Sequence, residues 1–322
     1  MLETTGKHQH LPQPTLKYVA VARMEDRYRY FARKLGQSRA SPLRYLLERE
    51  RLRASSGTRI VACGSGGFVL TYSDGKRSKH SKRLCGAHRT LKEFVWNASA
   101  RHRPHKAMKR HGPRGPLVFS DGRAYHGATA GLERGKYVHT QLQAYATLPW
   151  KRFQAMYPTV DPLTKAAIKH LRDAMHVTPV DAEYLVFDAV SGVGTAIDLV
   201  CITNNGPPAL VLVEIKTGYS GAFTSASGRF RAKSPLAGAD DTPLNRARTQ
   251  LLLSKSLFEY GDAQKCRSQA CPPIKMAIVQ VEDGKGAAER AYVRSFGMES
   301  IRGSLAFMQY IRAQKSNATP LL

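Results

Sequence analysis

Apolar and polar positions follow different patterns in the two parts of this chain. Near the N-terminus, residues 24–52 have helical spacing, and residues 58–72 form an apolar run that is interrupted by glycines. The first pattern predicts a helix with a break at Ser41 and Pro42, and the second predicts two strands joined by a glycine turn. The basic run 76–83 and the Pro- and Gly-rich residues 101–116 lack periodicity, so we predict a loop and a linker there.

From about residue 117, helical and β-rich segments alternate, which is typical of an α/β domain with a mixed central sheet flanked by helices. Helices are predicted at 131–148, 162–175 and 244–260, and strands at 183–189, 195–202, 210–216, 274–281 and 290–294. Residues 217–242 are rich in Gly, Ser and Ala and are predicted to form a long mobile loop. The expected organisation is a basic N-terminal region (1–116), an α/β core (117–300) and a C-terminal tail (301–322).

The chain carries 50 Lys and Arg against 24 Asp and Glu, a formal net charge of +26. Residues 1–115 hold 26 of these basic residues and only 7 of the acidic ones, so most of the excess precedes the α/β core. The excess favours nucleic acid as partner, because basic side chains replace the counterions that condense on phosphates. Membrane-surface binding and simple solubility are the alternatives. The run 76–83 also suits a nuclear-localisation signal, a phosphate-binding loop or a solvated loop.

Aromatic and basic residues interleave in the predicted N-terminal helix. The stretch contains Arg27, Tyr28, Arg29, Tyr30, Phe31, Arg33 and Lys34. Aromatic rings among arginines suit stacking on exposed bases. A solvated helix whose aromatic residues face the core is an equally good interpretation.

Membrane-spanning and disulfide-bonded classes are not expected. No apolar run approaches the roughly 18 residues that a spanning helix needs, and the N-terminal sequence lacks the layout of a secretory signal. The five cysteines are odd in number and irregularly spaced, so we expect an intracellular, reducing compartment. This would be the nucleus in a eukaryote or a virus of eukaryotes, and otherwise the cytoplasm. A zinc site from Cys63, Cys85, His80 and His88 lacks paired spacing.

Two neighbouring predicted strands carry charged residues among apolar ones. Asp198 lies inside a β-rich apolar run, where an unpaired charge is costly, and the apolar strand that follows ends in Glu214, Ile215 and Lys216. Because alternate strand residues share a face, Glu214 and Lys216 point the same way and Ile215 points oppositely. The turn at 203–208 would make the strands antiparallel and bring Asp198 beside Glu214. Carboxylate oxygens in this arrangement suit Mg²⁺ (or Mn²⁺), and a buried salt bridge without metal is the alternative.

This arrangement resembles the motif of the PD-(D/E)XK nuclease superfamily, in which an aspartate is followed after a hairpin-length gap by Glu-x-Lys. The RecB-like and lambda-exonuclease-like branches also place a histidine on an upstream helix, a glycine before the aspartate and a glutamine on a later helix. This chain has His139, Gly194 and Gln250 in that order. It departs at Ile197, where many members have proline, and at Ser254, where they often have tyrosine.

The resemblance covers roughly residues 125–295 and implies a restriction-endonuclease-like core, with the basic N-terminal extension unaccounted for. It implies metal binding by His139, Asp198, Glu214 and the carbonyl of Ile215, and catalysis by Asp198, Glu214, Lys216 and Gln250. Apart from the resemblance, Lys136, Arg246 and Arg248 suit contacts with phosphate, and Arg229 and Arg231 in the Gly- and Ser-rich loop suit contacts with a DNA strand. Solvated basic side chains and a disordered loop are the alternatives. Lys216 would activate or position water. Glu183 begins a strand where some relatives carry a further acidic group. An iron–sulfur cluster is not expected, since only Cys266 and Cys271 lie near the C-terminal end of the core.

We therefore expect a Mg²⁺-dependent hydrolase of phosphodiester bonds, acting on DNA and on linear or single-stranded ends, with a role in recombination or repair. An exonuclease is favoured over an endonuclease because the branch resembled is mostly exonucleolytic. Two alternatives stay open: an inactive nuclease fold that binds or packages nucleic acid, and an RNA-processing nuclease. The oligomeric state is not predicted.

Overall fold

The computed structural model of this chain describes residues 16–38, 40–63, 67–73, 79–96, 117–118, 124–125, 130–218, 223–224, 239–261, 271–282, 292–298 and 304–318. The predicted linker 101–116 lies outside the described residues, and so does most of the predicted loop 217–242, including Arg229 and Arg231.

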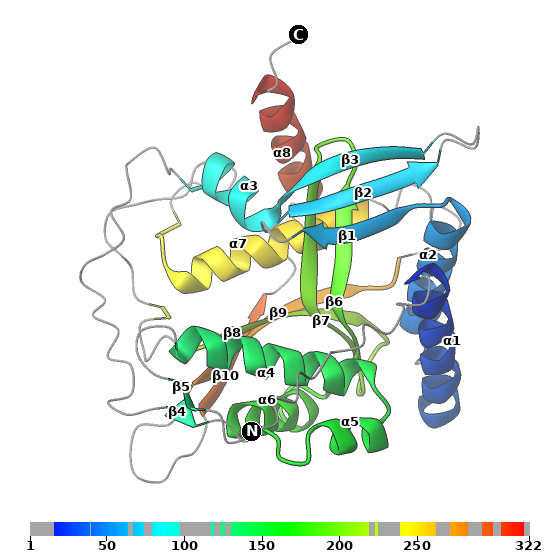
Figure 1. Cartoon of the computed structure of the whole chain (residues 1–322), viewed down its shortest axis with the longest axis vertical. Coiled ribbons are helices and arrows are strands. Elements are labelled where there is room, and N and C mark those ends of the chain that lie inside the picture. The colour runs from blue at the N-terminus through cyan, green and yellow to red at the C-terminus, as the bar shows by residue number, and fades with distance from the viewer. Residues whose placement is uncertain are drawn as a thin grey trace, which may run out of the picture.

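A mixed eight-stranded sheet forms the centre of the molecule (Figure 1). Its strands are β1 (Arg59–Cys63), β2 (Gly67–Ser73), β3 (Lys79–Gly86), β6 (Val177–Asp188), β7 (Val193–Thr203), β8 (Leu210–Thr217), β9 (Ile274–Glu282) and β10 (Tyr292–Met298). Two short strands, β4 (Leu117–Val118) and β5 (Ala124–Tyr125), pair separately. Strand β7 is central because it has three neighbours: antiparallel β6, antiparallel β8 and, at its start, parallel β3. Strand β8 continues the sheet into parallel β9 and then antiparallel β10.

Helices cover both faces of this sheet. They are α1 (Leu16–Leu35), α2 (Ser41–Ser55), α3 (Ala87–Phe94), α4 (Ala130–Thr147), α5 (Trp150–Met156), α6 (Pro162–Asp173), α7 (Pro243–Ser256), which continues as the π-helical turn η2 (Leu257–Gly261), and α8 (Ser304–Ala318). One apolar cluster joins α4 and α6 to β7, β8 and β9, and the other joins α1, α2, α3, α7 and α8 to the opposite face. Strand β8 is buried over its first six residues, which explains its nearly continuous apolar sequence.

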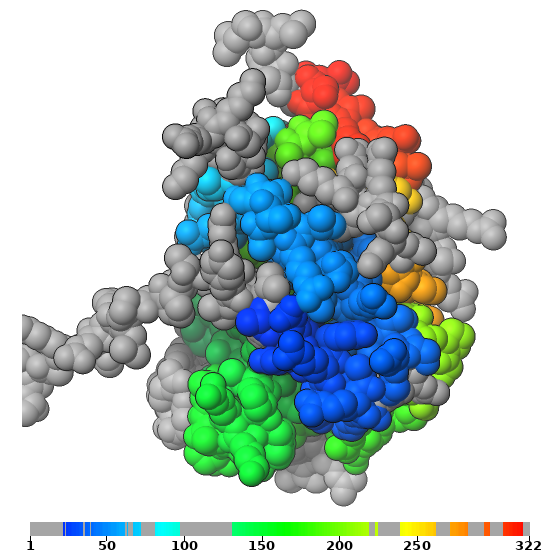
Figure 2. Space-filling view, turned by 90° about the vertical axis from the view of Figure 1, so that its right-hand side faces the viewer, coloured from blue at the N-terminus to red at the C-terminus, as the bar shows by residue number. Residues whose placement is uncertain are grey.

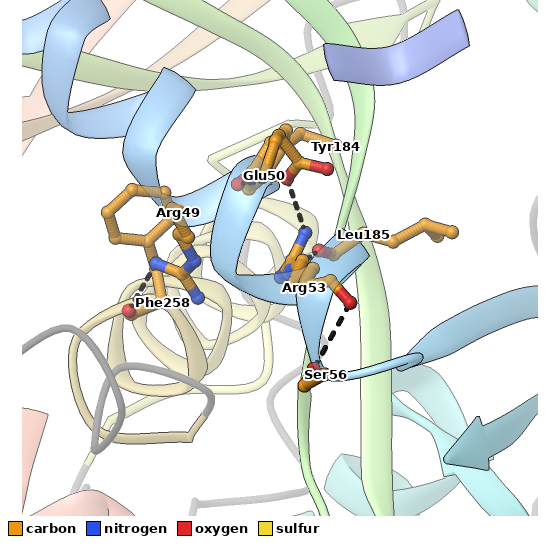
Figure 3. Close-up of polar contacts among 7 residues, drawn as sticks. All are labelled: Arg49, Glu50, Arg53, Ser56, Tyr184, Leu185 and Phe258. Carbon is orange, nitrogen blue, oxygen red and sulfur yellow. Dashed lines mark hydrogen bonds and ion pairs between the residues drawn. The ribbon is translucent and has the colours of Figure 1, made fainter. Parts of the chain in front are cut away.

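The N-terminal region packs directly against the α/β core. Helix α2 lies against β6 and η2, where Arg53 donates to the carbonyl of Leu185 at 2.9 Å and Arg49 donates to that of Phe258 at 2.7 Å (Figure 3). Strand β3 extends the sheet by pairing Cys85 with Val193. The described residues on both sides of position 116 therefore share one hydrophobic core. The predicted division into an N-terminal region and a nuclease core stays a prediction.

Most segments of the predicted core have the secondary structure expected of them. The helices at 131–148, 162–175 and 244–260 are confirmed as α4, α6 and α7 with η2, and Asp161 caps α6 by accepting from the N–H of Leu163 at 2.8 Å. The strand at 183–189 is longer than predicted, because β6 begins at Val177 and pairs with β7 along its length. None of the described helices is both long and apolar enough to cross a membrane.

Two segments have more regular structure than the pattern indicated. The basic run predicted as a loop contains most of β3, whose Ser81, Lys82 and Arg83 stay exposed while the backbone pairs with β2. The predicted C-terminal tail contains α8, which buries Phe307 and Ile311 against α7 and η2. In both cases tertiary pairing supplies stability that local periodicity does not reveal.

Candidate metal centre

The strand pair β7–β8 places Asp198 beside the end of β8. Leu199 lies opposite Val213, so the two strands are antiparallel neighbours as the turn at 203–208 predicted. The carboxylate of Asp198 accepts a hydrogen bond from the N–H of Ile215, with 2.7 Å between Oδ2 and N. This bond fixes the Asp198 side chain against the backbone that links Glu214 to Lys216.

Glu214 and Lys216 share one face of β8, as strand alternation predicted. The Nζ of Lys216 lies 2.5 Å from Oε1 of Glu214, and Glu214 is buried with 1% of its surface exposed. Ile215 points to the opposite face and packs in the cluster formed by α4 and α6. The ion pair satisfies one oxygen of Glu214, whereas Oε2 is buried and has no hydrogen-bond partner.

Helix α4 passes close to the end of β8, and this places His139 beside Asp198. A Cβ on Gly135 would lie 2.6 Å from Oγ1 of Thr217, so glycine permits this approach. His139 follows one turn later, and its Nδ1 lies 4.0 Å from Oδ2 of Asp198. The ring also forms a hydrogen bond to the backbone of Ile215.

Glu183 on β6 completes the group from the other side of β7. Its neighbours Ala182 and Tyr184 lie opposite Leu199 and Ile197, so Glu183 is level with Asp198. Its φ of 49° is a left-handed backbone conformation that is costly for a residue with a side chain. Ligand atoms of His139, Glu183 and Asp198 all lie within 4.8 Å of one another. The strained backbone therefore belongs to the residue that brings a further carboxylate to Asp198.

The electrostatics of this group show too little positive charge for its carboxylates. Burial raises the pKa of Asp198 to about 6, although Lys216 and the Ile215 N–H oppose the rise. Burial and the nearby Asp198 raise the pKa of Glu214 to about 7, against the effect of Lys216. Burial and Glu214 also raise the pKa of Glu183. Three carboxylates face one lysine, so a further cation would stabilise their charged forms.

The pKa of His139 is shifted in the opposite direction. Burial and the charge of Lys216 lower it, while Glu214 and the bond to Ile215 raise it less. The ring is therefore neutral near pH 7. A neutral imidazole that donates one N–H to the backbone has its other nitrogen available as a metal ligand.

The donor set of this site fits a divalent cation. Carboxylate oxygens are the preferred ligands of Mg²⁺ and Mn²⁺, an imidazole nitrogen suits Mn²⁺ as well, and the buried Oε2 of Glu214 lacks a partner. The close group shares two members with the predicted ligand set. It contains His139 and Asp198 as predicted, adds Glu183, and leaves Glu214 paired with Lys216. The carbonyl of Ile215 stays a predicted ligand.

The other predicted residues that the structure describes lie on α4 and α7, most of them with partners outside the centre. Gln250 is half-buried on α7, one turn beyond Arg246, and its catalytic role stays a prediction. Arg246 binds both oxygens of Asp241, and Arg248 donates to Asn245 at 3.2 Å. Lys136 is exposed and pairs with Glu133. Ser254, where relatives of the resembled branch often have tyrosine, is buried and donates to the carbonyl of Gln250.

His88 was not predicted to belong to this neighbourhood. It lies at the start of α3, and its pKa is lowered by burial and by the charges of Arg246, Lys92 and Lys216. Helix α3 follows β3, which pairs with the start of β7 and so brings His88 near the centre. In the sequence, His88 was considered only for a zinc site with Cys63, Cys85 and His80, which lacks paired cysteine spacing. The side chain of His80 lies outside the described residues, so that site is not tested.

Comparison with family models, curated proteins and solved structures gives no match for this chain. Its function is therefore argued from the residues and geometry of this site.

Proposed function

We propose that this protein is a metal-dependent nuclease that hydrolyses phosphodiester bonds of DNA. The observation that carries the proposal is the group of His139, Glu183 and Asp198, whose ligand atoms lie within 4.8 Å of one another beside the Glu214–Lys216 pair. The mixed sheet with helices on both faces is compatible with the restriction-endonuclease-like core that the resemblance implies. Its histidine lies on the helix before the strands and its glutamine on the helix after them, as in the nucleases it resembles.

The surplus of carboxylates argues against a purely structural ion pair. A structural salt bridge needs one cation for each buried anion, because an unpaired buried charge is destabilising. Lys216 pairs with Glu214, and this leaves Asp198, whose side chain is 15% exposed, without a lysine or arginine of its own within the group. Glu183 is exposed and adds a third carboxylate to the group. An unpaired Asp198 costs stability, whereas a cation-binding site requires its charge.

Each residue has a distinct role in the proposed reaction. Asp198, Glu183 and His139 would hold Mg²⁺ or Mn²⁺, and Glu214 would add its free oxygen. A bound divalent cation lowers the pKa of a coordinated water and neutralises negative charge on the phosphate. Lys216, held by Glu214 at the end of β8, orients the attacking water by hydrogen bonding or stabilises the charge that develops on the phosphate. Asp198 is itself oriented by the Ile215 N–H.

A nucleic acid is favoured as substrate by the net charge of +26. DNA, and an exonuclease acting on its ends, are favoured by the branch that the motif resembles. An inactive protein that binds nucleic acid is the second candidate, since the same charge would serve it equally. The complete set of carboxylates with Lys216 favours the enzyme, because binding to phosphate alone gains nothing from buried acidic groups.

The test compares cutting of end-labelled linear DNA, closed circular DNA and RNA of matching sequence, with Mg²⁺ and with EDTA. We expect linear DNA to be degraded with Mg²⁺ and not with EDTA, and circles to be spared. Lys216→Ala is expected to slow cutting by about 100-fold or more. Lys165→Ala, an exposed lysine on α6 outside the centre, is the matched control and should cut at the native rate.

Absence of metal-dependent cutting by the native protein would support the binding function instead. Cutting that survives Lys216→Ala would refute the assigned site, and faster cutting of RNA would assign the enzyme to RNA processing.

A further inference from the structure

A cavity of about 260 Å³ lies between the N-terminal helix and the α/β core. Its walls come from α1, α4, α6, the start of β6 and the turn after β7. Figure 2 shows α1 in blue beside the green segments of α4 to α6 on this side of the molecule. None of its lining residues belongs to the metal centre.

The walls of this cavity combine aromatic, apolar and cationic groups. Phe31 and Tyr145 bring aromatic rings, while Ile168 and Pro179 supply further apolar surface. Lys34 and Arg172 are exposed cations among the lining residues, and Thr178 and Asn204 contribute polar groups, with the Thr178 hydroxyl donating to Asn204 at 2.7 Å. Apolar walls with cations at the rim suit a nucleobase with its phosphate.

The two cations are available for a phosphate. Arg172 pairs with the adjacent Asp173, but the two side chains are 66% and 45% exposed, so this pair is weak and its arginine can exchange partners. Lys34 is exposed, and its Nζ lies 5.7 Å from the centre of the ring of exposed Tyr30. A phosphate at this rim therefore displaces no buried ion pair.

The position of α1 relative to the core is fixed by buried contacts. Arg27 donates to the carbonyl of Ala146 at the end of α4 and lies 3.7 Å from Asp181 of β6. Its side chain and that of Asp181 are 12% and 2% exposed. The cavity is therefore formed before a ligand arrives, which reduces the entropy lost on binding.

We propose that this cavity binds one nucleotide of a single-stranded nucleic acid, with the base against Tyr145 and Phe31 and the phosphate between Lys34 and Arg172. Its volume is below the roughly 300–1,000 Å³ of pockets that enclose a whole small ligand, which favours one unit of a longer strand over a free effector. A base inside such a cavity must be unpaired, so the site selects single strands or frayed ends. The role of this cavity in cutting rests on the proposed function, because the cavity would hold a second part of the strand that the metal centre cuts.

The two sites are joined by one helix. His139 of the metal centre and Tyr145 of the cavity both lie on α4, about 9 Å apart along its axis. A strand held in the cavity is thus kept near the centre without contacting its metal ligands. Two aromatic residues of α1 that suited base stacking in the sequence take different positions. Phe31 lines the cavity, whereas the neighbouring Tyr30 is 52% exposed and packs edge-on against Phe31.

The test measures binding of a fluorescein-labelled 20-nucleotide single strand and of its duplex by fluorescence anisotropy, in EDTA and with Asp198→Asn in every protein. Cutting is then absent, so the result does not depend on the nuclease assignment. Tyr145→Ala is expected to weaken single-strand binding by about tenfold and to leave duplex binding unchanged, while Tyr145→Phe keeps the ring and the affinity. Lys34→Ala with Arg172→Ala is expected to reduce the salt dependence of log affinity by about 2.

The matched control is Arg44→Ala with Lys165→Ala, which removes the same charge from exposed positions outside the cavity. If the Lys34/Arg172 variant and the control weaken binding equally, position in the cavity does not matter and the proposal is wrong. Displacement of the strand by a free mononucleotide as effectively as by unlabelled strand would also overturn it, in favour of an effector site. Lys34 and Arg172 are both exposed, so replacing them should not unfold the protein. The Lys34/Arg172 variant therefore tests the proposal even if Tyr145→Ala lowers stability.

Discussion

Two groups of charged side chains differ in how their charge is balanced. One lies where α2 meets β6, and the other lies at the end of β8. Where α2 meets β6, Arg53 lies 2.8 Å from Oε1 of Glu50, which also accepts from the hydroxyl of Tyr184 at 2.7 Å (Figure 3). Arg53 further donates to the carbonyl of Leu185. Glu50 is matched by the cation Arg53, and both have additional hydrogen bonds. The neighbouring buried Arg49 donates to the carbonyl of Phe258 and lies over its ring.

At the end of β8 the balance is different. Asp198, Glu183 and Glu214 share the charge of Lys216, the pKa values of Asp198 and Glu214 rise to about 6 and about 7, and Oε2 of Glu214 has no partner. A structural ion pair brings its own compensation, whereas a binding site keeps a deficit that its ligand removes. The comparison separates residues that stabilise the fold from residues that we propose to bind a cation.

The largest difference is expected when one charge is removed from each group. Asp198→Asn should abolish metal-dependent cutting, by about 1,000-fold or more, and leave the metal-free protein as stable as the native one or more stable, because a poorly compensated charge is lost. Arg53→Ala should destabilise the fold by about 2–3 kcal/mol, because it leaves Glu50 buried without its cation. Cutting assays and urea unfolding in EDTA measure the two effects.

The control for this comparison is the activity of folded Arg53→Ala, which should stay within about threefold of native below its unfolding temperature. A large loss of stability in Asp198→Asn, or of activity in folded Arg53→Ala, would erase the distinction between the two groups.

A change of intermediate size is expected at Glu183, which has a strained backbone and belongs to the candidate metal centre. Glu183→Gly relieves a φ of 49° and removes one of the facing carboxylates, so we expect the metal-free protein to gain about 1 kcal/mol of unfolding free energy. Mn²⁺ affinity, measured by calorimetry, should fall about tenfold or more at the same time. Glu183→Gln, which keeps the strain and loses the charge, should lose affinity with a smaller gain in stability. Unchanged affinity in both variants would remove Glu183 from the site.

The last effect tests the comparison through the pH dependence of stability. The folded pKa values of Asp198 and Glu214 lie above their usual values, so protons bind more tightly to the folded than to the unfolded chain. Their contribution to stability is therefore complete below about pH 4 and is lost as the pH rises through about 6 and about 7. We expect the Tm of the metal-free native protein, relative to Asp198→Asn, to fall between about pH 5 and about pH 8 by the equivalent of roughly 2 kcal/mol. Added Mn²⁺ should reverse this trend above about pH 7, and a parallel pH dependence of the two proteins would contradict the raised pKa of Asp198.

The candidate site could be predicted from sequence to the extent that strand geometry determines it. Alternation along β8 was sufficient to put Glu214 and Lys216 on one face, and the turn at 203–208 was sufficient to pair β7 with β8. Glu183 was only a weak candidate, because its approach to Asp198 depends on a left-handed backbone conformation. The pattern of side chains along the sequence does not predict that conformation. His88 could not be found, since its position near Lys216 depends on the pairing of β3 with β7.

The sequence by itself determined the α/β alternation, the excess of basic residues and the order of Asp198, Glu214 and Lys216, because periodicity, charge and adjacent strands are local properties of a chain. Only the tertiary structure decided that the N-terminal region shares the core, that Glu183 faces Asp198 and that α1 and α4 enclose a cavity. The shared core and the cavity depend on contacts between residues more than 100 positions apart, such as Arg27 with Ala146, and burial of apolar surface over the whole sheet selects such contacts. Glu183 approaches Asp198 through a left-handed backbone conformation on β6.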